Sequence, residues 1–220
     1  MSENHDEQDT RIPSDSGRMV KVLDYTYDQA LAGLPGFKSV EEMADSYKAH
    51  ASDLEGAAKT LIRYQVAKAS TTGFVTGLGG LITLPVAVPA SLSSVLYIQL
   101  RMVASIAHMN GYDVHNDQVK TACYVCLAGN SAEGILKSSG VLIGQKLTEQ
   151  AIKRFSYETI KKINKAVGFR LITKFGHTGA INLSKGIPFV GGVVGGGIDG
   201  TMIYTTGRVA KRLFIHQELP

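Results

Sequence analysis

The stretch ASTTGFVTGLGGLITLPVAVPASLSSVLYIQL, from Ala69 to Leu100, decides the fold, because its 32 residues carry no charge. About 20 apolar residues are enough for a helix to cross a bilayer core. Pro85 and Pro89 interrupt this run together with several glycines, and proline is tolerated only in the first turn of a helix. The sequence therefore predicts two shorter helices broken near residues 83–89, with Pro89 in the first turn of the second and Asn110–Gly111 at its end.

A second glycine-rich apolar segment, GIPFVGGVVGGGIDGTMIYTTG, runs from Gly186 to Gly207. Its glycines recur at a spacing of four, and the first segment repeats this spacing. Residues four apart share one helix face, so the pattern predicts a bare groove in which another helix packs closely. Close packing offsets the roughly 1 kcal/mol that a glycine costs inside a helix. The predicted close-packing positions are Gly73, Gly77, Gly192, Gly196 and Gly200.

The rest of the chain shows helical periodicity and no strand alternation, so we expect an all-α helical bundle. Residues 1–17 are polar and acidic and predict a disordered tail, residues 18–67 form N-terminal helices, and residues 68–216 form the main helical domain. Ser39 and Glu42 have the spacing of a capping box, and Asn116 or Asp117 is placed to cap a later helix. Helices are predicted at 18–31, 39–68 and 116–138, with one or two amphipathic basic helices at 146–165, a connecting stretch at 169–183 and the last apolar helix from 188.

Charge is distributed unevenly along the chain. The formal net charge is +4, but residues 1–60 carry −6 and residues 61–220 carry +10. A cationic region suits anionic lipid, nucleic acid or the chain's own acidic N-terminus, and it is also compatible with a solvated basic face. No nucleic-acid partner is predicted, because no recognition motif is present and the basic residues are not interleaved with exposed aromatic residues. The polar start does not resemble a signal peptide, so a cytosol-facing location is expected.

Cysteine and histidine are common zinc ligands, and the chain has two of each close together in sequence: Cys123, Cys126, His108 and His115. The spacing of the two cysteines also matches a redox motif. The cysteines lie in an apolar helix, however, and no βαβ pattern accompanies them. Core packing is therefore the favoured interpretation, and neither a metal nor a cofactor is predicted. His177 in a Gly-His-Thr-Gly sequence has the chemistry of a general base, but no nucleophile motif accompanies it. No catalytic residue is assigned.

A buried carboxylate is costly unless it is paired, and Asp199 is the only charged residue between Gly186 and Gly207. Arg101, Arg170 or Lys174 is the expected partner. Arg101 directly follows the uncharged run, which suggests that it pins the two glycine-rich segments together. A lipid-headgroup or ligand site is the alternative to a structural ion pair.

Several motifs occur in the order found in the bacterial EcsC protein family, which the chain resembles over roughly residues 68–214. The motifs lie at 76–85, 89–90, 97–102, 111–113, 167–171, 173–174 and 188–199. The resemblance implies a cytosol-facing, membrane-associated accessory protein, since the family's namesake is encoded beside an ABC transporter implicated in secretion. It implies no catalytic residue. With Asp113 from one motif, the candidate polar site comprises Arg101, Asp113, Arg170, Lys174 and Asp199.

The leading hypothesis is a non-enzymatic, membrane-associated helical protein that acts by binding. Its basic helices at 146–174 would meet anionic lipid, and a transporter or another membrane protein is a candidate partner. Insertion of residues 71–100 into the bilayer is left open, as is the oligomeric state. The alternatives are a soluble helical domain that binds a partner protein or an apolar ligand, and a hydrolase that uses His177 or Asp199.

Overall fold

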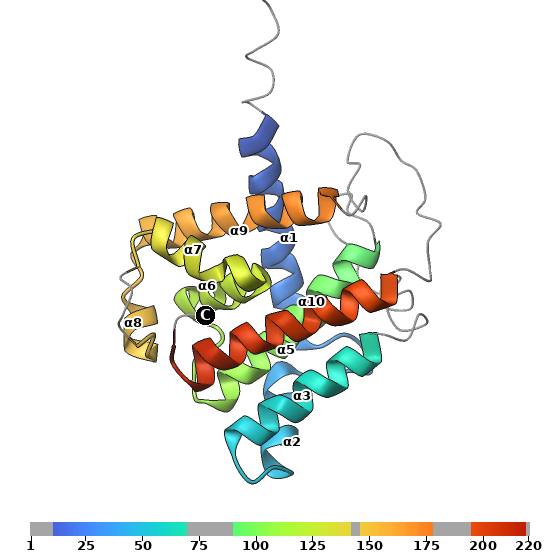
Figure 1. Ribbon diagram of the computed structural model, residues 1–220. Helices are drawn as coiled ribbons and strands as arrows, with labels where there is room; N and C mark the ends of the chain where they lie inside the picture. The colour runs from blue at the N-terminus through green and yellow to red at the C-terminus, as the bar shows by residue number, and fades with distance from the viewer. Residues whose placement is uncertain (1–10, 70–89, 142–145, 178–194, 219–220) are drawn as a thin grey trace, which may run out of the picture.

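The computed structural model describes residues 11–69, 90–141, 146–177 and 195–218. These ranges contain helices and connecting loops and no strand, which confirms the predicted all-α class (Figure 1). The helices are α1 (Arg11–Ala32), α2 (Val40–Ala49), α3 (Leu54–Ala69), α5 (Ala90–Met109), α6 (Asp117–Leu127), α7 (Ala132–Ser138), α8 (Glu149–Lys153), α9 (Tyr157–His177) and α10 (Gly195–Ala210).

Helix α5 is the centre of the fold. Every residue from Leu92 to Ala107 is buried, including polar ones such as Ser94 and Gln99. Helices α1, α2, α3, α6 and α10 all pack on it. Gly111, with a φ of +83°, ends the helical segment as predicted. The second half of the uncharged run is therefore core, covered by protein on every side.

The first half of that run, residues 70–89, lies outside the described residues. Within the described ranges, no helix combines the length with the apolar character that a membrane crossing requires. Most of the segment whose insertion was left open, residues 71–89, lies outside the described residues.

The N-terminal helices share one hydrophobic core with the rest of the described chain. α1 packs on α9 and α5, α2 packs on α5, and α3 packs on α10. α1 begins at Arg11, seven residues before the predicted start, so residues 11–17 are helical where a disordered tail was expected. Ser16 is buried in that first part of α1 and lies against Gly168 of α9. This tertiary contact stabilises a helical start whose sequence is polar.

The predicted helix at 116–138 is divided in the structure. Asn116 caps α6 by accepting from the backbone N–H groups of Gln118 and Val119, as predicted. α6 ends at Leu127, and a short 3₁₀ turn at Gly129–Ser131 separates it from α7. Gly129 has a φ of +59°, a backbone conformation that side-chain-bearing residues rarely adopt, so the chain bends there.

Helix α9 continues through the stretch that was predicted to connect two helices. Its buried residues Ile163, Val167, Leu171 and Phe175 recur every four positions and form one unbroken apolar face. The prediction of a connection from residue 169 is therefore wrong up to His177. The four-residue apolar spacing continues past residue 169, and the helix continues with it.

Close helix packing at glycine is observed at two positions that were not among the predicted ones. A Cβ added to Gly168 would lie 2.9 Å from the backbone oxygen of Ser16, and one added to Gly207 would lie 2.7 Å from Ile62 of α3. Gly200 is buried in α10. Gly73, Gly77 and Gly192 fall outside the described residues, and the surroundings of Gly196 are not described.

Candidate functional site

The residues predicted to form one polar site are dispersed over several elements. Arg101 is buried on α5, and its guanidinium donates a hydrogen bond to the backbone oxygen of Lys38, just before α2. Asp113 is exposed in the loop after α5, where its carboxylate accepts from the backbone N–H of His115 at 3.0 Å.

The other three candidates lie on α9 and α10. Arg170 and Lys174 are one turn apart on α9, which packs mainly on α1, α6 and α7. Burial lowers the pKa of Lys174, and the nearby charge of Arg170 lowers it further. Asp199 is in the first turns of α10, and its side chain is not described. Among the candidates whose side chains the structure describes, Arg170 and Lys174 are the two that lie together, and the ion pair of Asp199 stays a prediction.

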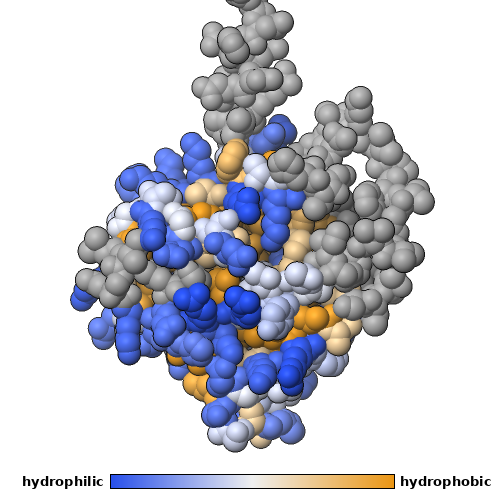
Figure 2. Space-filling view, viewed as in Figure 1, coloured by the Kyte–Doolittle hydropathy of each residue, from blue (hydrophilic) through white to orange (hydrophobic). Residues whose placement is uncertain are grey.

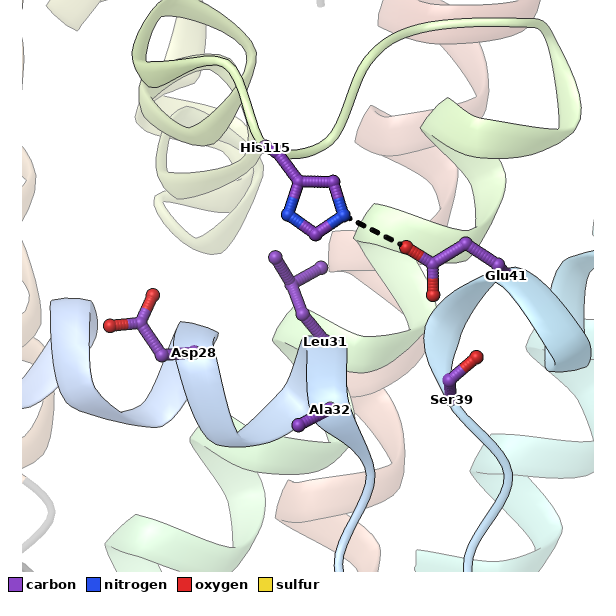
Figure 3. Close-up of a pocket in the computed structure, with 6 residues that line it drawn as sticks. All are labelled: Asp28, Leu31, Ala32, Ser39, Glu41 and His115. Carbon is purple, nitrogen blue, oxygen red and sulfur yellow. Dashed lines mark hydrogen bonds and ion pairs between the residues drawn. The ribbon is translucent and has the colours of Figure 1, made fainter.

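A shallow pocket of about 360 Å³ lies between the end of α1, the start of α2 and the loop after α5 (Figure 3). His115 Nε2 and Glu41 Oε1 are 3.1 Å apart across it and join the loop to α2. The lining residues are Asp28, Leu31, Ala32, Ser39, Glu41 and His115.

This pocket contains a histidine, carboxylates and a serine, but not in a catalytic arrangement. Ser39 Oγ accepts from the backbone N–H of Glu42, and the Ser39 N–H donates to the Glu42 carboxylate, which confirms the predicted capping box. The imidazole of His115 points at Glu41 and not at Ser39 (Figure 3). Nucleophilic catalysis requires a base within hydrogen-bond reach of the nucleophile. The geometry supports a hydrogen bond between His115 and Glu41 that fastens the loop to α2.

The electrostatics of Glu41 agree with that structural role. Burial alone would raise the pKa of its carboxyl, but backbone and side-chain hydrogen bonds, including the one with His115, leave the pKa below its usual value. A carboxylate with a lowered pKa is a weaker general base. Glu41 is therefore suited to pairing and poorly suited to proton transfer near neutral pH.

The two cysteines face the core of the protein. Cys123 Sγ lies 3.9 Å from the hydroxyl of Tyr27, and Cys126 Sγ donates to the backbone oxygen of Ala122 at 3.5 Å. In the part of the chain that the structure describes, no three His, Cys, Asp or Glu side chains gather as metal ligands would. Burial raises the pKa of Cys123 to about 12 and that of Cys126 well above its usual value.

We expect both thiols to be nearly inert in the folded protein. With a pKa of about 12 in place of 9, the Cys123 thiolate fraction at pH 8 falls about 1,000-fold, and burial blocks access as well. A chromogenic disulfide reagent should therefore react with fewer than about 5% of the thiols in the time that suffices for complete reaction in urea. Rapid labelling of either cysteine in the folded state would contradict this expectation.

The outer face of α9 belongs to the basic segment that was predicted to meet anionic lipid, and it also carries exposed aromatic residues that were not predicted. Every fourth residue of one row is exposed: Tyr157, Lys161, Lys165 and Phe169. Tyr157 is 75% exposed and Phe169 is 45% exposed. In Figure 2, mostly hydrophilic residues occupy the upper part of the visible face, over α7 and α9. We call this row, together with the neighbouring Lys162, the α9 ridge.

The lysines of the α9 ridge differ from other lysines in their surroundings. Lys161, Lys162 and Lys165 make no ion pair with any acidic residue that the structure describes. Lys137 and Lys153 of the neighbouring helices, by contrast, pair with Glu133 and Glu149 one turn earlier. The positive charge of the ridge lysines is therefore not neutralised by an ion pair with any acidic residue that the structure describes.

The spacing of aromatic and basic residues along α9 was available from the sequence but was not recognised. The sequence analysis expected no exposed aromatic residues among the basic ones, and Tyr157 and Phe169 show that this expectation was wrong. Phe175 on the same helix is buried, so the residue type alone does not indicate which phenylalanine faces solvent. The signal was the four-residue spacing of Tyr157, Lys161, Lys165 and Phe169.

Comparison with known proteins places this architecture in a family. The model of the EcsC protein family matches residues 8–216, which is nearly the whole chain. The chain belongs to the EcsC protein family. The EcsC match includes helices α1–α3, which the sequence analysis placed largely outside the resemblance. No curated protein and no solved structure matches this EcsC chain.

Proposed function

We propose that this member of the EcsC family is a non-enzymatic protein that attaches peripherally to anionic membranes through the α9 ridge. The observation that carries the proposal is the exposed row Tyr157, Lys161, Lys165 and Phe169, whose lysines have no acidic partner among the described residues. Service to a transport or secretion system in that membrane rests on the family resemblance alone.

The composition of the α9 ridge matches the chemistry of a membrane surface. Each lysine or arginine close to an anionic leaflet contributes about 1 kcal/mol of binding. Tyrosine favours the headgroup region, where its ring meets apolar tails and its hydroxyl meets water, and a phenylalanine ring adds apolar area that enters the boundary with the tails. Tyr157 and Phe169 are about 18 Å apart along the helix, at 1.5 Å per residue. They would hold both ends of a helix that lies parallel to the surface.

The acidic content of the ridge is small enough to permit this attachment. Glu158 is the one acidic residue within α9, and it lies at the first turn, where a carboxylate also stabilises the helix dipole. The underside of α9 is held by α1 and α6. Attachment therefore requires no unfolding of the helix and no exposure of its buried face.

Sedimentation with vesicles tests the proposal. We expect binding to vesicles with about 30% phosphatidylglycerol and little binding to pure phosphatidylcholine. The double variant Lys161→Glu/Lys165→Glu should lower the affinity at least about 10-fold, because roughly 1 kcal/mol is lost for each lysine removed and the new carboxylates are repelled. Raising the salt concentration should weaken wild-type binding.

A matched control distinguishes the ridge from net charge. Lys59 and Arg63 are exposed one turn apart on α3, which lies at the opposite end of the molecule from α9 in Figure 1. Lys59→Glu/Arg63→Glu changes the net charge equally and should bind anionic vesicles nearly as wild type does. Equal loss in both variants, or no wild-type binding at low salt, would overturn the proposal. Binding of RNA with the same lysine dependence, and none of vesicles, would assign the ridge to nucleic acid.

A further inference from the structure

The sequence directly after α5 contains the one Asn-Gly pair of the chain, Asn110 followed by Gly111. An asparagine followed by glycine is prone to deamidation, because glycine has no side chain that hinders its backbone nitrogen from attacking the side-chain amide. Gly111 is exposed and Asn110 is half-buried, and a Cβ added to Gly111 would meet no heavy atom within 4 Å. Solvent therefore reaches the pair, and its reactivity depends on how the fold holds the two reacting groups.

Deamidation of this pair needs water as its only co-reactant. The Gly111 backbone nitrogen forms a bond to Asn110 Cγ, the bond between Cγ and Nδ2 breaks, and ammonia leaves with the proton that the Gly111 N–H gives up. The product of this step is a five-membered succinimide ring. Water then opens one of the two C–N bonds of the ring, which leaves aspartate or isoaspartate at position 110.

The backbone at the end of α5 holds the attacking nitrogen. The Gly111 N–H donates to the His108 oxygen at 2.9 Å, and the Tyr112 N–H donates to the Ala107 oxygen at 3.2 Å. These two bonds, with the φ of +83° at Gly111, form the Schellman pattern that closes many helices. The Gly111 nitrogen must leave this helix cap before it can bond to Asn110 Cγ.

The side chain of Asn110 is held by a segment far along the chain. Asn110 Nδ2 donates to the Phe214 backbone oxygen at 2.6 Å, across 104 positions. Rotation of the side-chain amide toward the Gly111 nitrogen requires that this hydrogen bond break. Its acceptor belongs to the turn Lys211–Ile215 after α10, which we call the C-terminal turn. The fold therefore restrains both reacting groups, one by the helix cap and the other by the C-terminal turn.

The C-terminal turn is attached to the rest of the molecule by a buried ring and by polar contacts. The ring of Phe214 is fully buried. Lys211 pairs with the Glu55 carboxylate of α3, and just after the turn the Gln217 oxygen accepts from the Leu147 N–H at 2.9 Å. Ion pairs with partly exposed side chains contribute little to stability, so the buried ring is the main attachment. A segment held in this way can open locally while the remaining helices stay folded.

We propose that Asn110 is a deamidation site that the C-terminal turn protects, and that local opening of this turn permits the reaction. The product cannot restore the lost contact, because a carboxylate and the Phe214 backbone oxygen both only accept hydrogen bonds. The helix dipole also disfavours a carboxylate at the C-terminal end of α5. An opening that leads to reaction therefore loosens the turn permanently. The proposal is independent of the α9 ridge, since none of these residues belongs to α9.

Peptide mapping by mass spectrometry, after incubation of the protein at mildly alkaline pH, tests this site. Conversion of Asn110 should be at least about 10-fold slower in the folded protein than in urea, because a protected group reacts only from its open state. In urea, Gly111→Ala should slow the conversion several-fold, because the added methyl group hinders the attacking nitrogen. Asn116 and Asn130, which are not followed by glycine, are internal references and should stay largely unconverted.

Variants that loosen different parts of the fold identify the opening that matters. Phe214→Ala should raise the rate of conversion without urea at least about 10-fold, because it removes the ring that anchors the turn. Glu55→Gln is a milder variant that removes the charge shared by Lys211 and His216, and it should raise the rate about 3-fold. Gly168→Val loosens the crossing of α1 and α9 elsewhere in the molecule and should leave the rate unchanged.

Three results would overturn the proposal. The first is equally fast conversion of Asn110 in the folded protein and in urea, or no conversion in urea. The second is an acceleration by Gly168→Val as large as that by Phe214→Ala, which would mean that global unfolding exposes the site. The third is a wild-type rate in Glu55→Gln. The Glu55→Gln variant decides the matter even where Phe214→Ala does not fold.

Discussion

Replacing Phe214 by alanine is expected to lower the free energy of unfolding by about 3–5 kcal/mol, the cost of removing a fully buried aromatic ring. Phe214 is 0% exposed and follows α10 in the turn Lys211–Ile215. Its ring meets the edge of Tyr112 with centroids 5.1 Å apart and planes at 76°. The Phe214 backbone oxygen also accepts from the Asn110 side chain at 2.6 Å. The substitution leaves a cavity where the end of the chain is held to α5.

Urea unfolding followed by circular dichroism measures this effect, and Phe169→Ala is its matched control. Phe169 is 45% exposed on the α9 ridge, so its truncation should change the free energy of unfolding by no more than about 0.5 kcal/mol. The same variant should weaken binding to anionic vesicles. A loss of less than about 1 kcal/mol for Phe214→Ala would contradict the described packing.

The substitution Gly168→Val is expected to cost about 3 kcal/mol, because α1 and α9 cross with no space for a side chain. Even a Cβ at this position would lie 2.9 Å from the Ser16 backbone oxygen, and it would also meet Val20 at 3.4 Å. A backbone atom inside α1 cannot rotate away as the tip of a side chain can. The two helices would have to separate, which disturbs the buried face of each.

Gly134→Val is the control for the crossing. Gly134 is exposed in α7, and a Cβ there would have no heavy atom within 4 Å. Because valine has a slightly better helix propensity than glycine, this control should be neutral within about 0.5 kcal/mol. Thermal and urea unfolding of the two variants should therefore diverge. Equal stability would show that α1 does not lie on α9 as described.

The Gly168 crossing and the α9 ridge connect the stability of the protein with its proposed function. α1 lies under α9 at the Gly168 crossing, and the buried row Ile163, Val167, Leu171 and Phe175 fixes which side of α9 faces inward. The α9 ridge is exposed for that reason. A variant that separates α1 from α9 should weaken vesicle binding indirectly, whereas Lys161→Glu/Lys165→Glu should weaken it without loss of stability.

Helix ends were the part of the fold most open to prediction. The capping box of Ser39 and Glu42, the cap at Asn116 and the stop at Gly111 all appear in the structure. Each depends on atoms within a few residues of one another, so local sequence contains the necessary information. The boundaries that failed at Arg11 and at residue 169 depend instead on contacts between α1 and α9. Two predicted helices, at 39–68 and 116–138, are each divided in the structure, the first into α2 and α3 and the second into α6 and α7.

The candidate polar site was less predictable than the helices. The described neighbours of Arg101 are Lys38, Phe37 and Lys68, and its predicted pairing with Asp199 stays a prediction, because the Asp199 side chain lies outside the described part of the structure. The sequence shows that a charge follows an uncharged run, but it does not show which side of α5 carries that charge. The answer depends on the loop before α2, more than 60 residues earlier in the chain.

By itself, the sequence determined an all-α protein, several of its helix ends, a cationic later part and membership of the EcsC family. Only the tertiary structure decided that Phe175 is buried while Phe169 faces solvent, and that Arg101 shares the Phe37 ring with Lys68. The physical reason is that burial and charge environment arise between segments far apart in the chain. Tyr27, for example, donates to the Val114 backbone oxygen at 2.8 Å across 87 positions. No local sequence pattern indicates that two residues so far apart in the chain are in contact.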